Sequence, residues 1–279
     1  MRHGTMNGLL VIAIVIAVPA AAAGQARETG HKITEREAAA VLLDDGDSRD
    51  TWRAIGLAVE LGPRAGQELR AAVIEAAWAE VRREAAARGG VGPAGGDPDR
   101  MFMLFDAAAA LRDPRTIPLM TEALKYGSGG SNALANLGAV AFPAVLAAVR
   151  DPGGHPYQVS GGVTALRFMI EDGWLNAPRL EQVREVTRER LSGSQDHFIV
   201  NAAVRLALAL GDPELRRTVE RIATDRAFVA ALIPAYWDDG TPRKSEHLVW
   251  RLDSVQKYAR LFLSGGGADI GPLRRPAPP

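Results

Sequence analysis

The sequence predicts an all-α protein, and three observations support this prediction. Alanine and leucine are abundant while runs of β-branched residues are scarce, which favours helices over strands. Apolar residues recur at helical spacing, as at Leu69, Val73, Ala77 and Val81. No stretch alternates apolar and polar residues between hairpin turns. The chain is therefore expected to be built from helices.

Charge and cysteine content exclude several classes of protein. The 279 residues carry 33 basic and 33 acidic side chains, so the formal net charge is zero and no basic excess points to nucleic acid. The absence of cysteine excludes disulfides, thiolate metal sites and cysteine nucleophiles.

Residues 1–23 have the layout of a secretory signal peptide. Arg2 and His3 give a weakly positive start, an apolar run follows over 9–18, and three alanines ending at Ala23 offer a cleavage site. The apolar run is short for a membrane span. We expect an exported protein, periplasmic or extracellular, with no stable membrane insertion after cleavage. An uncleaved membrane anchor is the alternative.

The next section, 24–88, is expected to be helical. Thr34 and Glu37 form a capping box that opens its first helix, and Asp50 is a candidate cap for the second. The second and third helices are expected over 52–61 and 66–87.

The Gly- and Pro-rich stretch 89–100 is predicted to be a linker. The glycines from Gly90 to Gly95 match the G-x-G-x-x-G spacing of a dinucleotide-binding loop, but a charged helix precedes them and Pro93 removes a phosphate-facing N–H. The tail, 264–279, is expected to be disordered. Between the linker and the tail, helices are expected near 101–112, 114–125, 131–138, 141–150, 158–172, 178–191, 197–210, 213–224, 227–234 and 245–263.

Two Asp-Pro pairs mark where one helix ends and another begins. Asp113 and Asp212 each follow an apolar helix and precede a proline, so the Asp is expected to cap the new helix and the Pro to occupy its first turn. These pairs lie 99 residues apart, room for about three repeats of thirty-odd residues. Asp113 and Arg115 are accordingly interpreted as structural residues.

The repeated pieces resemble HEAT repeats of the short bacterial, PBS-lyase type. They are AAALRDPRTIPLMTEAL (108–124), LANLGAVAFPAVLAAVRD (134–151) and AVRLALALGDPELRRTV (203–219). The resemblance covers roughly 101–224 and implies, over 101–263, an α-solenoid of stacked antiparallel helix pairs, irregular in its N-terminal part. A helical bundle without repeats is the alternative.

The sequence contains no pattern of catalytic or metal-binding residues. No two histidines are spaced for a zinc site, no G-x-S-x-G motif is present, and the aspartates of LLDDGDSRD lack the spacing of a calcium loop. We therefore expect no enzyme activity, no metal and no cofactor.

Two groups of residues are candidate binding sites. One is a set of arginines on second helices, expected either to form a basic stripe for an acidic peptide or to pair with Glu181, Glu185 and Glu220 as a solvated face. This set comprises Arg184, Arg188, Arg217 and Arg221. The other is the loop AYWDDGTPRKSEH, in which Tyr236, Trp237, Asp238 and Asp239 form either a ligand-contacting lip or an ordinary packed turn.

These features favour a non-catalytic scaffold that binds protein partners. One alternative is an envelope protein that binds a small molecule or metal through the 235–247 loop. Another is an enzyme accessory, since some HEAT-like proteins resemble bilin lyases, which attach a chromophore to a partner. A third is a domain that joins a larger assembly through its open repeat ends.

Overall fold

The computed structural model describes residues 33–44, 49–88, 98–126, 129–193, 195–235, 242 and 244–265. Within these ranges the chain is helical and has no β-strand, so the predicted all-α class is confirmed. The α-helices are α2 (Glu35–Leu43), α3 (Arg49–Leu61), α4 (Gln67–Arg88), α5 (Pro98–Leu111), α6 (Ile117–Ala123), α7 (Gly130–Asn136), α8 (Phe142–Arg150), α9 (Pro156–Glu171), α10 (Ala177–Ser192), α11 (His197–Leu210), α12 (Pro213–Thr224), α13 (Arg226–Leu232) and α14 (Ser245–Leu263).

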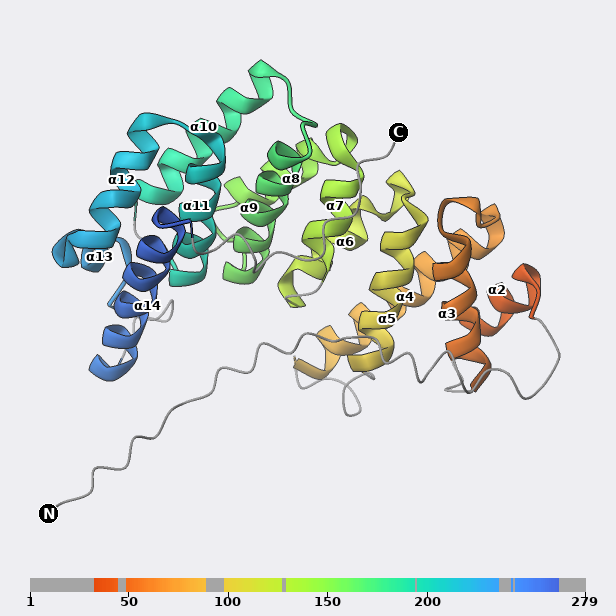
Figure 1. Ribbon diagram of the computed structural model, residues 1–279. Coiled ribbons are helices and arrows are strands. Elements are labelled where there is room, and N and C mark those ends of the chain that lie inside the picture. Colours follow the sequence, from red (N-terminus) through yellow and green to blue (C-terminus); the bar gives the residue numbers. More distant parts are fainter. Residues whose placement is uncertain are drawn as a thin grey trace, which may run out of the picture.

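The helices follow one another in a row from α2 to α14 (Figure 1). Most consecutive helices pack on one another, and most helices also contact a second helix farther along the chain. In what we call the first layer, α3 packs on α5, α5 on α7, α7 on α9, α9 on α11, and α11 on α14. In the second layer, α4 contacts α6, α6 contacts α8, α8 contacts α10, and α10 contacts α12. One connected apolar core between the layers runs from Ala38 to Ala259.

Asp113 holds the corner between α5 and α6. Its Oδ1 accepts the backbone N–H of Arg115 at 2.9 Å, and its Oδ2 lies 2.6 Å from Nη2 of Arg115. Nη1 of Arg70, on α4, reaches the same Oδ2 at 3.4 Å. Asp113 is only 5% exposed, so it links the corner to the second layer from a buried position. The structural role predicted for Asp113 and Arg115 is confirmed.

The surroundings of Asp113 stabilise its charged form. The side chain of Arg115 lowers the pKa of Asp113 most, burial opposes it, and the backbone N–H of Arg115 and the side chain of Arg70 lower it further, to about 2. Because the folded pKa lies below that of an unfolded aspartate, the carboxylate contributes stability that is present above pH 4 and is lost as the pH falls towards 2.

Most predicted helix starts are confirmed. Thr34 and Glu37 form the capping box, with the Thr34 N–H donating to Oε2 of Glu37 at 2.8 Å. Asp212 caps α12 through the N–H groups of Glu214 and Leu215, at 2.8 and 3.2 Å. Pro118 lies in the first turn of α6, after a short 3₁₀ turn over Pro114–Thr116.

Two details of the prediction are wrong. Asp50 cannot cap α3 because that helix begins earlier, at Arg49, and Asp50 accepts instead from Arg53 at 3.1 Å. The linker ends before residue 98, where α5 begins. The expected signal peptide, residues 89–97 and the tail beyond 265 lie outside the described residues.

Glycines let α9 approach its neighbours closely. A Cβ added to Gly162 would lie 2.7 Å from Cγ2 of Val149 on α8, and one on Gly161 would lie 2.9 Å from Cδ2 of Leu124. Real Cβ atoms do not approach that closely, so the packing between the two layers depends on these glycines.

We expect Asp113→Asn to lower the free energy of unfolding by about 2 kcal/mol at pH 7, since asparagine still caps a helix but cannot form the ion pairs. The difference from the wild type should shrink between pH 4 and pH 2, where the native carboxylate is protonated. Urea denaturation of both proteins at pH 4 and at pH 2 measures this difference in the free energy of unfolding. A difference independent of pH would contradict the role given to Asp113.

Gly162→Ala should destabilise the fold by about 1–2 kcal/mol, because the clash with Val149 outweighs the gain in helix propensity. The matched control is Gly56→Ala on α3, where an added Cβ meets nothing within 4 Å. That change should stabilise by about 0.5–1 kcal/mol. Equal stabilisation by both, measured by chemical denaturation, would show that α8 and α9 are not in close contact.

Candidate functional site

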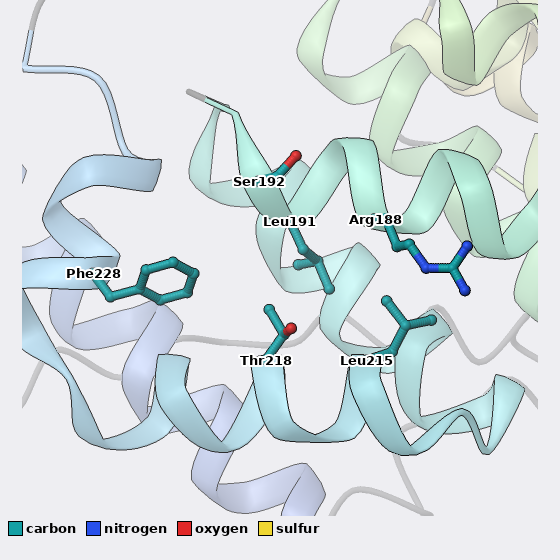
Figure 2. Close-up of a pocket in the computed structure, with 6 residues that line it drawn as sticks. All are labelled: Arg188, Leu191, Ser192, Leu215, Thr218 and Phe228. Carbon is teal, nitrogen blue, oxygen red and sulfur yellow. The ribbon is translucent and has the colours of Figure 1, made fainter.

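A groove of about 260 Å³ lies between α10 and α12, with α13 at one end (Figure 2). Figure 2 shows Phe228 at one end and Arg188 at the other, with the remaining side chains between them. The lining residues are Arg188, Leu191, Ser192, Leu215, Thr218 and Phe228. The floor is apolar, because Leu191 and Leu215 are buried, whereas the two hydroxyl groups and the arginine stand at the sides.

The helix pattern explains why this floor is apolar. On α10 the side chains of Val183, Val186 and Leu191 are buried, and on α12 those of Leu215 and Val219. Each set recurs at helical spacing and faces the core. The groove lies where the two buried stripes meet the surface.

Arg184 and Arg188, both on α10, share two carboxylates. Nη1 of Arg184 lies 3.0 Å from Oε2 of Glu181, and Nη1 of Arg188 lies 3.5 Å from Oε1 of the same residue. Nη2 of Arg188 lies 3.5 Å from Oδ2 of Asp212, the cap of α12. The ion pairs therefore connect α10 to the start of α12.

Asp212 is the carboxylate of α12 that pairs with the arginines at this end of the groove. Backbone N–H groups of Leu215 and Glu214 lower its pKa, partial desolvation opposes them, and Arg188 and Arg184 lower it further. Asp212 is therefore ionised at neutral pH and orients the Arg188 guanidinium beside the groove.

A similar arrangement holds Phe228 at the other end. Asp225 caps α13 by accepting the Phe228 N–H at 2.9 Å, and Nε of Arg221 lies 3.1 Å from its Oδ2. The Arg221 guanidinium lies 4.1 Å from the centroid of the Phe228 ring. Hydrogen bonds from Phe228 and Arg221 lower the pKa of Asp225. The ring is thus fixed by its own helix cap and by a stacked cation.

The four predicted arginines lie on the two helices of the groove, and carboxylates accompany all of them. Arg217 is the most exposed, with Nη2 lying 3.9 Å from Oε1 of Glu214. Of the expected partners, Glu181 pairs with two of the arginines, whereas Glu185 pairs with Arg150 and Glu220 with Arg216. Four carboxylates balance the charge of the set, namely Glu181, Asp212, Glu214 and Asp225.

The second predicted site is outside what the structure describes. Tyr236, Trp237, Asp238 and Asp239 all lie in the undescribed stretch 236–241, so a role for them stays a prediction. His247, the last residue of that predicted loop, lies in the first turn of α14 and is exposed, with Nε2 lying 3.9 Å from Oε1 of Glu246.

The apolar part of the groove is not predicted by any sequence motif. Phe228 and Thr218 belong to no sequence motif, and Leu191 and Leu215 have the spacing of ordinary core residues. One signal was present: Asp225 stands immediately before α13, where aspartate is a favoured cap, although no proline follows it as it does after Asp113 and Asp212.

The described residues contain no group of three or more His, Asp or Glu placed to hold a metal ion. Among the same residues, no helix has the length and apolar character needed to cross a membrane. His155 accepts the Tyr157 N–H at 3.3 Å and so caps α9.

No known family, curated protein or solved structure matches this chain. The function must therefore be inferred from its own residues.

Removing Asp212 should affect stability more than removing Arg188. Arg188→Ala deletes a half-exposed ion pair and should change the free energy of unfolding by less than about 0.5 kcal/mol. Asp212→Ala removes the cap of α12 and should lower the melting temperature by a few degrees. Thermal denaturation of both variants tests this. Equal losses in melting temperature would show that Asp212 contributes no more to stability than Arg188.

Proposed function

We propose that the protein is an exported, non-catalytic α-solenoid scaffold of the HEAT-like type, and that it binds a protein partner through the groove between α10 and α12. The solenoid proposal is supported by the alternating contacts of the two layers, in which each helix pair adds to the one before. The export proposal is supported by the signal-peptide layout of residues 1–23.

The size and lining of the groove carry the proposal for binding. Its volume of about 260 Å³ is below the roughly 300–1,000 Å³ of small-molecule sites and suits one or two side chains of a polypeptide. Among the described residues, the lining contains two hydroxyl groups and an arginine but no histidine or carboxylate to act as a general base. This lining therefore suits the binding of a partner better than it suits catalysis.

The charges around the groove define the kind of partner. The arginines beside it already have carboxylate partners, so an excess of acidic charge is not required of the ligand. An apolar side chain over Leu191 and Leu215, flanked by polar residues that exchange hydrogen bonds with Ser192 and Thr218, fits this lining best.

A photo-crosslinker tests the proposal directly. Benzoylphenylalanine placed at Thr218, inside the groove, should give a discrete crosslinked protein in the cells that produce this chain. The same residue at Arg216, on α12 but outside the groove lining, is the matched control and should not.

Adding Phe228→Glu should reduce the Thr218 crosslink at least about ten-fold, because it places a charge at the apolar end of the groove. Equal crosslinking at Thr218 and Arg216, or no effect of Phe228→Glu, would contradict binding at this site.

A further inference from the structure

Three exposed aromatic rings lie together near the N-terminal ends of α9, α11 and α14. The ring centroids of Tyr157 and Phe198 are 4.8 Å apart. The ring of His197 lies 4.0 Å from that of Phe198 and 5.4 Å from that of Trp250, so it joins α11 to α14. Tyr157, Phe198 and Trp250 are 44%, 38% and 57% exposed, whereas His197 is buried. We call Tyr157, Phe198 and Trp250 the aromatic face.

Adjoining exposed rings from three helices are typical of a surface that another polypeptide covers. Aromatic-lined surfaces bind proline-rich segments in the polyproline II form, because that extended helix loses little entropy when it binds. This chain contains such a segment, PLRRPAPP, at residues 272–279, beyond the last described residue, Gly265.

The spacing of side chains in this segment suits the aromatic face. Polyproline II has three residues per turn, so Leu273, Pro276 and Pro279 would share one side of it, and that side is wholly apolar. Successive members of this side would be about 9 Å apart. The rings of Phe198 and Trp250 are no farther apart than about one such turn, because His197 separates them by steps of 4.0 and 5.4 Å.

Carboxylates flank Trp250 on the exposed side of α14. Glu246 precedes Trp250 by four residues and Asp253 follows it by three, spacings that share one side of a helix. Asp253 already pairs with an arginine of α13, whereas the ion-pair partner that the described residues offer Glu246 is exposed His247, at 3.9 Å. Glu246 can therefore accept a further cation, and the proline-rich segment carries one in Arg274.

The chain beyond α14 is long enough to reach this position. Trp250 lies 15 residues before Gly265, which corresponds to about 22 Å along the helix. Leu273 follows Gly265 by eight residues, and an extended segment of that length spans up to about 25 Å. Leu273 can therefore lie beside Trp250, and Pro276 one turn farther on beside Phe198.

We propose that residues 272–279 dock on the aromatic face of their own chain as a polyproline II segment. Leu273, Pro276 and Pro279 contact the exposed rings, and Arg274 pairs with Glu246. Docking covers apolar surface that would otherwise be open to other molecules.

A spin label tests this contact in the full chain. The sequence has no cysteine, so Ala277→Cys provides a single attachment point that does not share a side of the polyproline helix with Leu273. A nitroxide at residue 277 should broaden the indole N–H signal of Trp250 in the NMR spectrum. The signal of Trp52, on α3 at the other end of the row, should stay sharp.

Two double variants of the labelled chain separate the apolar side from proline content. Pro276→Ser with Pro279→Ser removes two members of the apolar side and should abolish the broadening of Trp250. The matched control, Pro272→Ser with Pro278→Ser, removes two prolines from another side and should keep it.

A sharp Trp250 signal in the labelled chain, or the same response from both double variants, would overturn the proposal. Mixing isotope-labelled unmodified chain with spin-labelled chain of natural isotope content tests docking between copies. Broadening of Trp250 in that mixture would assign the contact to a second copy and would also overturn it. The aromatic face belongs to the first layer, so a failed crosslink at Thr218 would leave this proposal unaffected, and the reverse also holds.

Discussion

Each helix of this protein can bury its apolar face only against the next helices of the row, and the rest of the structure depends on that constraint. In the first layer α9 packs on α7 and α11, and in the second layer α10 packs on α8 and α12. The layers meet through small residues such as Gly162, whose lack of a side chain permits the close approach of α8. Corners such as that of Asp113 then fix where each helix ends.

The same constraint gives the two layers different surfaces. On α10 and α12 the outward residues are charged, and their arginines and carboxylates pair with one another. On α9, α11 and α14 the outward face includes half-buried aromatic rings and the Arg205 cation. The groove thus belongs to the face on which arginines and carboxylates pair with one another.

The sequence predicts the helices well because their signals are local. Asp212 and Thr34 cap the helices that they precede, and the periodicity of apolar residues fixes which face is buried. The sites depend on distant pairs that no local pattern reveals. Phe228, for example, reaches the groove only because α13 returns beside α12.

Small-angle X-ray scattering from a chain trimmed to residues 33–265 tests the row of helices most directly. A compact bundle of that length has a radius of gyration of about 17–18 Å and a symmetric distribution of interatomic distances. If the helices contact only their neighbours in two layers, the radius of gyration should be clearly larger and the distribution of interatomic distances should have a long tail. A radius near 17–18 Å with a symmetric distribution would contradict the arrangement on which the proposed groove depends.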